Sequence, residues 1–202
     1  MSSRSIGLLG GTFDPVHCAH LAIARAARMD FDLDEVWFMP CAANPFKPPA
    51  VASGPARMEM LRLALREEPG SLVSPLEVSR EAPTYTIDTM RLLRKRYPFA
   101  QFTFILGADS LLELHTWKDF AELFTYARFV TYARPGTPRP RLEDLQMPFE
   151  TAAMLLQDFR VGVPQPVSAS EIRATLKAGK PLPAGTVPES VLAYIRRKGL
   201  YR

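Results

Sequence analysis

Short hydrophobic runs alternate along the chain with segments that have helical spacing. Runs typical of buried strands cover Ser5–Leu9, Glu35–Met39, Phe102–Leu106, Ala127–Ala133 and Phe159–Val163. Segments typical of amphipathic helices cover Leu21–Ala27, Ala56–Arg66, Ile87–Tyr97, Lys118–Phe124 and Ser170–Ala178. This alternation predicts an α/β fold with a parallel sheet flanked by helices. Such sheets bind ligands at the carboxyl ends of their strands, where the strand order reverses.

The end of the chain predicts a small helical cap. Thr186 and Glu189 have the spacing of a capping box, and Gly199 predicts where the last helix stops. A length of 202 residues favours a single domain. We expect a core over about 1–165 and a C-terminal helical segment over about 166–202.

Composition excludes several classes of protein. Hydrophobic residues make up 47% and charged residues 23%, and no apolar stretch approaches the ~20 residues of a membrane span. Residues 1–4 lead into the first strand without a signal region, and two cysteines form no Cys-x-x-Cys. We therefore expect a cytoplasmic protein that binds no membrane. The sequence carries no signal for an oligomeric state.

Charge favours an anionic partner. The net charge of +4 suits either a nucleotide or a nucleic acid. The basic clusters at 94–96 and 196–198 fall in the last turns of predicted helices, where cations complement the helix dipole. We interpret these clusters as structural, and we expect no nucleic-acid partner.

The segment from Gly10 to His20, GGTFDPVHCAH, connects the first predicted strand to the first predicted helix. Gly10 and Gly11 let the backbone approach a ligand closely, and the Asp-Pro pair fixes the turn. The imidazoles of His17 and His20 add donors that are charged when protonated, beside the free N–H groups of the helix's first turn. These features predict a polyphosphate site.

Other interpretations of this segment are weaker. The P-loop motif needs a lysine and the dinucleotide-binding motif a third glycine, and both are missing here. A zinc site at His17-Cys18-His20 lacks an evident fourth ligand. The two histidines could also be turn residues whose hydrogen bonds are satisfied within the protein.

Two further segments carry candidate binding residues. Ser168 and Glu171 have the spacing of a capping box, which leaves Ser170 and Arg173 without a structural reason and predicts a second phosphate site at a helix start. Asp109 follows the predicted strand Phe102–Leu106. Its carboxylate could accept from a ribose hydroxyl, reach a metal ion through water, or cap a helix.

Aromatic residues stand at two predicted helix starts. Tyr85 lies within PTYTIDT and Trp117 within LHTWK. Each ring could belong to the core. A partly exposed Trp117 would alternatively stack on a small charged heteroaromatic ring.

Together these motifs resemble the nucleotidyltransferase superfamily, which joins a nucleotide to a phosphorylated acceptor. The bacterial nicotinate-mononucleotide adenylyltransferases are the most similar family, and the likeness extends nearly from end to end. It includes GGTFDPVHCAH, NPFK at 44–47, PTYTIDT, GAD at 107–109, Trp117, RPG at 134–136 and SASEIR at 168–173. The resemblance implies a Rossmann-like fold and synthesis of nicotinate adenine dinucleotide and pyrophosphate from ATP and nicotinate mononucleotide, a step of NAD biosynthesis.

The resemblance also implies roles for individual residues. His17, His20 and Arg173 would be catalytic. The residues that would bind ATP are Gly10, Gly11, Thr12, Phe13, His17, His20, Gly107, Asp109, Ser168, Ser170 and Arg173. Those that would bind the mononucleotide are Lys47, Thr84, Tyr85, Thr86, Trp117, Lys118 and Arg134. Mg²⁺ would arrive with ATP rather than in a site built from protein ligands.

The chain departs from the family pattern at three places. Ala19 replaces a glycine, Ala169 replaces a serine, and NPFK stands where many members have PPHK. The methyl group of Ala19 limits how closely adenine or its ribose can approach. Alternative functions are adenylyl transfer to pantetheine phosphate, use of both nicotinate and nicotinamide mononucleotides, and non-catalytic binding of nucleic acid.

Overall fold

One parallel sheet of six strands forms the centre of the protein. The computed structural model describes residues 4–43, 48–80, 84–162 and 167–202. The strand order is β3-β2-β1-β4-β5-β6, and every neighbouring pair is parallel. The bounds are β1 Ser5–Gly11, β2 Glu35–Pro40, β3 Ser71–Val73, β4 Gln101–Gly107, β5 Ala127–Ala133 and β6 Phe159–Val161. The order reverses between β1 and β4, which confirms a Rossmann-like α/β fold.

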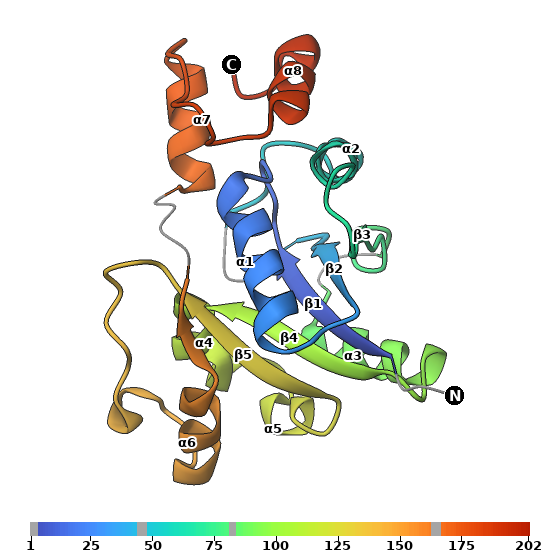
Figure 1. The fold of residues 1–202 in the computed structure, drawn as a ribbon, viewed down its shortest axis with the longest axis vertical. Coiled ribbons are helices and arrows are strands. Elements are labelled where there is room, and N and C mark those ends of the chain that lie inside the picture. Colours follow the sequence, from blue (N-terminus) through green and yellow to red (C-terminus); the bar gives the residue numbers. More distant parts are fainter. Residues whose placement is uncertain (1–3, 44–47, 81–83, 163–166) are drawn as a thin grey trace.

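Helices cover both faces of the sheet (Figure 1). One buried cluster joins the sheet to α1, α2, α7 and α8, and the other joins it to α3, α4, α5 and α6. The bounds are α1 Cys18–Asp30, α2 Gly54–Ala64, α3 Thr86–Arg96, α4 Ala108–Glu113, α5 Phe120–Leu123, α6 Phe149–Gln157, α7 Ala169–Lys177 and α8 Glu189–Lys198, with short 3₁₀ turns η1 Leu114–Thr116 and η2 Leu142–Asp144.

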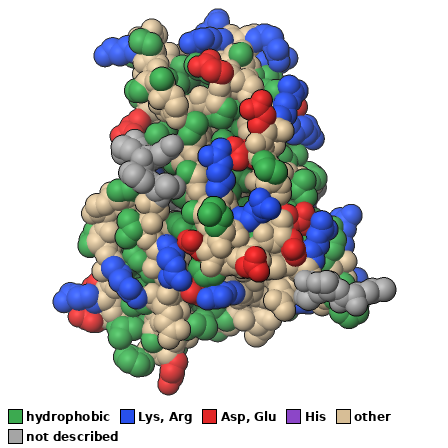
Figure 2. All heavy atoms as spheres, viewed as in Figure 1, with side chains coloured by type: hydrophobic (Ala, Val, Ile, Leu, Met, Phe, Trp, Pro, Cys, Tyr) green, Lys and Arg blue, Asp and Glu red, His purple; other side chains and the backbone are tan. Residues whose placement is uncertain are grey.

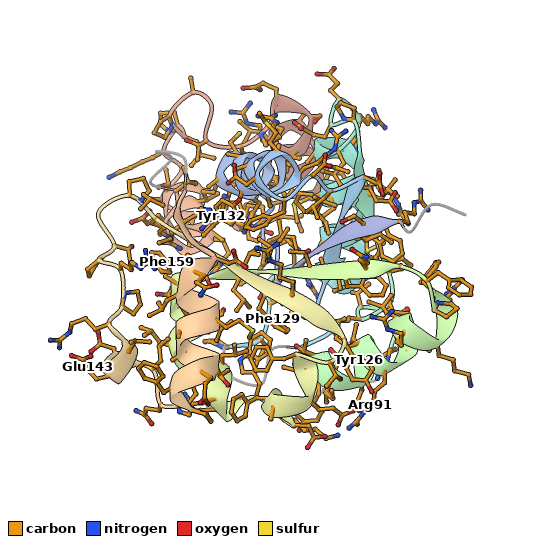
Figure 3. All side chains as sticks on the ribbon, turned by 60° about the horizontal axis from the view of Figure 1, so that its bottom comes forward. Arg91, Tyr126, Phe129, Tyr132, Glu143 and Phe159 are labelled. Atoms are coloured by element: carbon orange, nitrogen blue, oxygen red, sulfur yellow. The ribbon has the colours of Figure 1, made fainter. Side chains whose placement is uncertain are left out.

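Side chains alternate between the two faces of each strand, as the pleat requires. On β5, Phe129 belongs to the cluster under α3–α6, and Tyr132 belongs to the cluster under α1. Figure 3 shows these two side chains on opposite sides of the sheet. The Tyr132 hydroxyl donates to Asp30 at the end of α1 (2.6 Å), which ties that end of the helix to the sheet.

The C-terminal helices pack where α1 begins (Figure 1). The backbone N–H of Cys18 donates to the Thr186 carbonyl (3.0 Å), and Ser190 Oγ donates to the Leu63 carbonyl (3.3 Å). Val191 and Ile195 of α8 are buried in the same cluster as α1 and α2. This packing brings residues near 170 and near 200 beside the segment that follows β1.

The last helix ends where the sequence predicted but does not begin with the predicted capping box. Gly199 adopts the expected left-handed conformation (φ 62°) and ends α8. The predicted capping box at Thr186 is wrong, because Pro188 is the N-cap of α8. The Thr186 hydroxyl instead donates to the Pro183 carbonyl (2.7 Å).

The surface carries charges of both signs. On the face shown in Figure 2, basic side chains are spread over the molecule and gather over α7 and α8, with acidic ones among them. The basic residues 94–96 and 196–198 lie in the last turns of α3 and α8, as predicted. None of the helices in the described part of the chain has the length and apolar character needed to cross a membrane.

Candidate active site

A cavity of about 440 Å³ opens beyond the carboxyl ends of β1 and β4. This is the point where the strand order reverses, so the cavity lies where ligands of such sheets bind. Its lining consists of Gly10, Gly11, Thr12, Cys41, Ala43, Glu77, Thr84, Tyr85, Thr86, Phe104, Ile105, Leu106, Gly107, Ser110, Thr116, Trp117 and Lys118. The sequence prediction that several motifs share one edge of the sheet is confirmed for these residues.

The segment after β1 is held by buried hydrogen bonds. The Asp14 carboxylate, 3% exposed, accepts from the backbone N–H groups of Val51 (2.7 Å) and Ala52 (3.0 Å). Arg57 reaches from α2 and donates to the Thr12 carbonyl (2.8 Å). The peptide bond between Asp14 and Pro15 is cis, and Phe13 has a positive φ of 50°. The hydrogen bonds of Asp14 and Arg57 tie this turn to α2 and to the segment that precedes it.

The two histidines of this segment stack on each other at the start of α1. Their ring centroids are 3.7 Å apart, and the His17 backbone N–H donates to His20 Nδ1 (3.2 Å). An imidazole nitrogen that accepts a hydrogen bond carries no proton, so in neutral His20 the proton is on Nε2.

His17 is the N-cap residue of α1, and its side chain is 5% exposed. Burial, together with the positive charge of Arg134, lowers its pKa to about 4. Its buried Nδ1 has no hydrogen-bond partner among the described residues. His17 is thus a neutral donor or acceptor at neutral pH.

The first turn of α1 offers fewer free N–H groups than predicted. The Cys18 N–H donates to the Thr186 carbonyl (3.0 Å), and the His20 N–H donates to the His17 carbonyl (2.9 Å). The C-terminal segment therefore occupies part of this helix terminus.

The second predicted phosphate motif lies at the start of α7. Ser168 is the N-cap, and its hydroxyl accepts from the Glu171 N–H (3.2 Å), as predicted. No return bond from the Glu171 side chain is found among the described residues, so the capping box is only half formed. An α-helix leaves its first N–H groups without a partner inside the helix, and at α7 these belong to Ala169 and Ser170.

Arg173 joins the two phosphate motifs directly. One guanidinium nitrogen donates to the Asp14 carbonyl (2.7 Å), and the other donates to Ser170 Oγ (3.2 Å). Asp14 stands three residues before His17 in the same turn. The predicted convergence of these motifs in space is therefore seen in the geometry.

Gly107 and Asp109 lie beside the cavity where β4 meets α4. Asp109 is exposed in the first turn of α4, and the N-cap residue is Gly107. The alternative in which Asp109 caps a helix is therefore wrong, and its carboxylate is open to solvent. A Cβ added to Gly107 would meet no atom within 4 Å, so space for a ligand adjoins this backbone.

An aromatic wall closes the other side of the cavity. Trp117 is partly exposed, and its ring stands edge-on to Phe104 with centroids 5.9 Å apart. Lys118 Nζ lies 4.9 Å above the Tyr85 ring and donates to Asp88 (3.3 Å). Because Trp117 lines the cavity, its ring borders the space that a flat ligand could occupy.

The N-terminus of α3 faces the same cavity. Tyr85 is its N-cap residue and provides no side-chain cap, and both Tyr85 and Thr86 line the cavity. An uncapped first turn presents backbone N–H groups and the positive end of the helix dipole, which favour an anion. A carboxylate or phosphate would be stabilised there.

Two buried polar groups belong to the cavity wall: Thr84, which the resemblance assigned to the mononucleotide, and Glu77, which carried no recognised signal in the sequence. Glu77 accepts from Thr89 Oγ1 (2.8 Å), and burial raises its pKa. The Thr84 hydroxyl is buried and has no hydrogen-bond partner within the described ranges. Arg57 and Tyr201 were missed as well, because each stands in a segment that looks like an ordinary helix face or chain end.

Some predicted site residues lie elsewhere. Lys47 falls outside the described residues. Arg134 follows β5 and acts on His17 through its charge, and it is not part of the cavity lining to which the mononucleotide was assigned. Among the described residues, no group of three or more His, Cys, Asp or Glu side chains could hold a metal ion, and a zinc site at His17-Cys18-His20 is not formed.

Comparisons with known proteins define the class. The family model for cytidylyltransferase-like proteins matches residues 8–175, and the chain belongs to this family. Curated relatives narrow the assignment. A probable nicotinate-nucleotide adenylyltransferase of Gloeobacter violaceus is 40% identical over 97% of this chain and 95% of its own length. A second probable nicotinate-nucleotide adenylyltransferase, from Thermus thermophilus, is 42% identical over 98% of this chain and 99% of its own length. Within the family, the chain is one of the nicotinate-nucleotide adenylyltransferases.

Solved structures show the same fold. Plasmodium falciparum nicotinic acid mononucleotide adenylyltransferase complexed with NaAD gives a TM-score of 0.73 at 19% identity, covering 98% of this chain and 97% of that one. The same enzyme complexed with APC gives a TM-score of 0.70 at 18% identity, and the match covers 98% of this chain and 97% of that chain.

Proposed function

We propose that this enzyme transfers the AMP part of ATP to nicotinate mononucleotide, releasing pyrophosphate and forming nicotinate adenine dinucleotide for NAD biosynthesis. One observation carries this proposal: Arg173 bonds to Asp14, which places two phosphate motifs together at the sheet edge that also holds the cavity beside Trp117. The names of the curated relatives agree with this activity. A non-catalytic nucleic-acid-binding domain would leave the aromatic cavity unexplained.

The ATP phosphates would lie between α1 and α7. His17, His20 and Arg173 would act on the reacting phosphates, while Ser168, Ser170 and the N–H groups at the start of α7 would bind the β and γ groups. The backbone of residues 10–13 would approach the nucleotide closely, and Gly107 with Asp109 would contact its ribose. The distance between Arg173 and Ser170, 3.2 Å, supports their joint use.

The mononucleotide would occupy the part of the cavity between Trp117 and the start of α3, while the part beside residues 10–12 and Gly107 would adjoin ATP. Its pyridine ring would stack on Trp117, and its ring carboxylate would accept from backbone N–H groups at Tyr85 and Thr86, where α3 begins without a side-chain cap. Lys118 and the Thr84 hydroxyl would add donors. Lys47 and Arg134 are proposed to neutralise the acceptor's phosphate, Arg134 from a position close to His17.

The reaction would proceed by direct in-line displacement. An oxygen of the mononucleotide phosphate forms a bond to the α-phosphorus of ATP, while the bond from that phosphorus to the β-phosphate oxygen breaks and its electrons leave with pyrophosphate. Because the nucleophile is already an anion, no general base is needed. The protein aligns two anions that repel each other and stabilises the charge that grows on the leaving group.

Neutral His17 suits this task in a specific way. With its pKa lowered to about 4, it enters the complex uncharged and donates one N–H to a phosphate oxygen. The negative charge of bound ATP then raises its pKa, so that a proton taken up with ATP would add positive charge beside the leaving group.

We propose that Mg²⁺ enters with ATP. The described residues provide no cluster of ligands for a protein-bound ion, and Mg²⁺ is commonly held by phosphate oxygens and water. The ion supplies charge neutralisation to the phosphates, and the protein residues above bind and orient them.

A substrate panel tests the proposal. Purified protein with ATP and Mg²⁺ is given nicotinate mononucleotide, nicotinamide mononucleotide or pantetheine phosphate, and pyrophosphate release is measured. We expect release with nicotinate mononucleotide and none with pantetheine phosphate, because only the pyridine nucleotides can use Trp117. Release with pantetheine phosphate alone would overturn the proposal. The ratio of the two pyridine nucleotides measures how strictly nicotinate is preferred.

A further inference from the structure

The Tyr201 side chain reaches from the C-terminal segment to the turn between β1 and α1, which carries the first phosphate motif. The Tyr201 hydroxyl donates to Asp14 Oδ1 (2.7 Å), across 187 positions of sequence. Tyr201 is 6% exposed and Asp14 is 3% exposed. This bond is therefore shielded from water, and it links the C-terminus to the Gly10–His17 segment.

The Asp14 carboxylate has several donors of different kinds. Oδ1 accepts from Tyr201 and from the Ala52 N–H, and Oδ2 accepts from the Val51 N–H. Arg173 Nη1 lies 3.9 Å from Oδ2, while it donates to the Asp14 carbonyl at 2.7 Å. The guanidinium of Arg173 is thus close to the carboxylate without being hydrogen-bonded to it.

The Tyr201 hydroxyl helps to keep Arg173 close to the Asp14 carboxylate without a hydrogen bond between them. A carboxylate that loses one of its donors attracts the nearest cation more strongly, and that cation is Arg173. A shift of the guanidinium toward the carboxylate would draw it away from Ser170 and from the phosphates that both are proposed to bind. By donating to Oδ1, the Tyr201 hydroxyl offsets part of the carboxylate's charge and so weakens its attraction for Arg173, which lies beside Oδ2.

The conformation of Tyr201 also points to a defined role. Its φ of 62° lies in the left-handed region, which an aromatic residue rarely adopts unless its surroundings hold it there. Burial and the bond to Asp14 raise the pKa of the Tyr201 hydroxyl, so it stays protonated and remains a donor at neutral pH.

We infer that Tyr201 is a positioning residue for adenylyl transfer: through Asp14, its hydroxyl holds Arg173 and the turn before His17 in the arrangement that binds the ATP phosphates. The inference rests on the proposed function. It concerns the ATP half of the site, because the cavity lining assigned to the mononucleotide includes neither Asp14 nor Tyr201.

The test is Tyr201→Phe, with Tyr132→Phe as a matched control. Tyr132 is also buried, and its hydroxyl also donates to an aspartate, Asp30, at 2.6 Å, but at the opposite end of α1. Both variants lose one buried hydrogen bond to a carboxylate. Only the first changes the Asp14 network, so a purely structural role would make the two variants behave alike.

Steady-state kinetics and thermal unfolding are measured for both variants, with assays run well below every unfolding midpoint. We expect Tyr201→Phe to lower kcat/KM for ATP by about tenfold and to leave KM for nicotinate mononucleotide within about twofold of its original value. Tyr132→Phe should change neither constant by more than about twofold. Unchanged kinetics of Tyr201→Phe, or equal losses in both variants, would overturn the inference.

Binding of a non-hydrolysable ATP analogue to the parent protein separates this inference from the proposed function. If the parent binds no analogue and releases no pyrophosphate, the proposed function fails. If the parent binds it and Tyr201→Phe binds it equally well with unchanged turnover, only the role of Tyr201 fails. Weaker binding in Tyr201→Phe alone supports the role.

Discussion

The buried, neutral state of His17 predicts a specific dependence of stability on pH. The unfolded chain binds a proton on this side chain with the ordinary pKa of 6.5, and the folded protein binds it with a pKa lowered to about 4. The unfolded state therefore holds more protons between these values, so stability falls as the pH falls through this window. The substitution His17→Asn removes the titration while keeping a good N-cap residue at the start of α1.

The magnitude follows from the two pKa values. A tenfold difference in proton affinity is worth about 1.4 kcal/mol, so the whole difference is worth roughly 3 kcal/mol once the pH is well below 4. At pH 4.5 about 2.5 kcal/mol of this is already lost. Above about pH 7 the loss is negligible. Because His17 is 5% exposed, solvent screening reduces these figures little.

The assay is chemical denaturation of both proteins at pH 7.5 and pH 4.5. Carboxylates and other groups common to both proteins cancel in the comparison. We expect the stability of the parent, relative to His17→Asn, to fall by about 2.5 kcal/mol between the two pH values. His17→Gln, a second variant that cannot titrate, should give the same change. Parallel pH profiles for parent and variants would refute a buried, neutral His17.

Two substitutions in the cavity should act on different substrates. Trp117→Ala removes the stacking surface, so KM for the mononucleotide should rise by about tenfold or more while KM for ATP stays unchanged; equal effects on both constants would argue against stacking. Gly107→Ala adds a methyl group that meets no protein atom, so it should lower the free energy of unfolding by less than about 1 kcal/mol. The same methyl group enters the space proposed for the nucleotide, so KM for ATP should rise several-fold. An unchanged KM in the steady-state assay would place ATP elsewhere.

The longer elements of the fold could be predicted from the sequence. The strand Ala127–Ala133 has the predicted bounds, and the helices at α2, α3 and α7 lie within two residues of theirs. These segments are long enough for their hydrophobic spacing to be read. The short helix α5, Phe120–Leu123, also lies within two residues of its predicted bounds. β3 was missed, because a strand of three residues depends on neighbours in space rather than on local pattern.

Helices α4 and α6 were missed for other reasons. α4 begins directly after Gly107, which is both the last residue of β4 and the N-cap residue of α4, so no separate loop divides the two elements. α6 begins after Pro148, in a segment with few charged residues, and it carries a buried stripe of Ala152, Leu155 and Leu156. The long connection over residues 134–148, with four prolines, separates α6 from β5, so the regular spacing of strand and helix is interrupted there.

The candidate site was predictable where local motifs carry it. Residues of the segments at 10–20 and 168–173 meet as predicted, because strand order places both at one edge of the sheet. The lowered pKa of His17 and the bond from Tyr201 to Asp14 could not be predicted. Both depend on burial by segments that are distant in sequence, including Arg134 after β5 and the C-terminus itself.

The joint use of His17 and Arg173 on one ATP tail is tested most directly by a double-mutant cycle. Pyrophosphate release is measured for His17→Ala, Arg173→Met and the double variant, at saturating nicotinate mononucleotide. Each single change should lower kcat/KM for ATP by about a hundredfold. Because both groups stabilise one transition state, the double variant should lose far less than the roughly ten-thousandfold product of these effects. Losses that multiply in full would show that the two side chains act independently and would contradict the account.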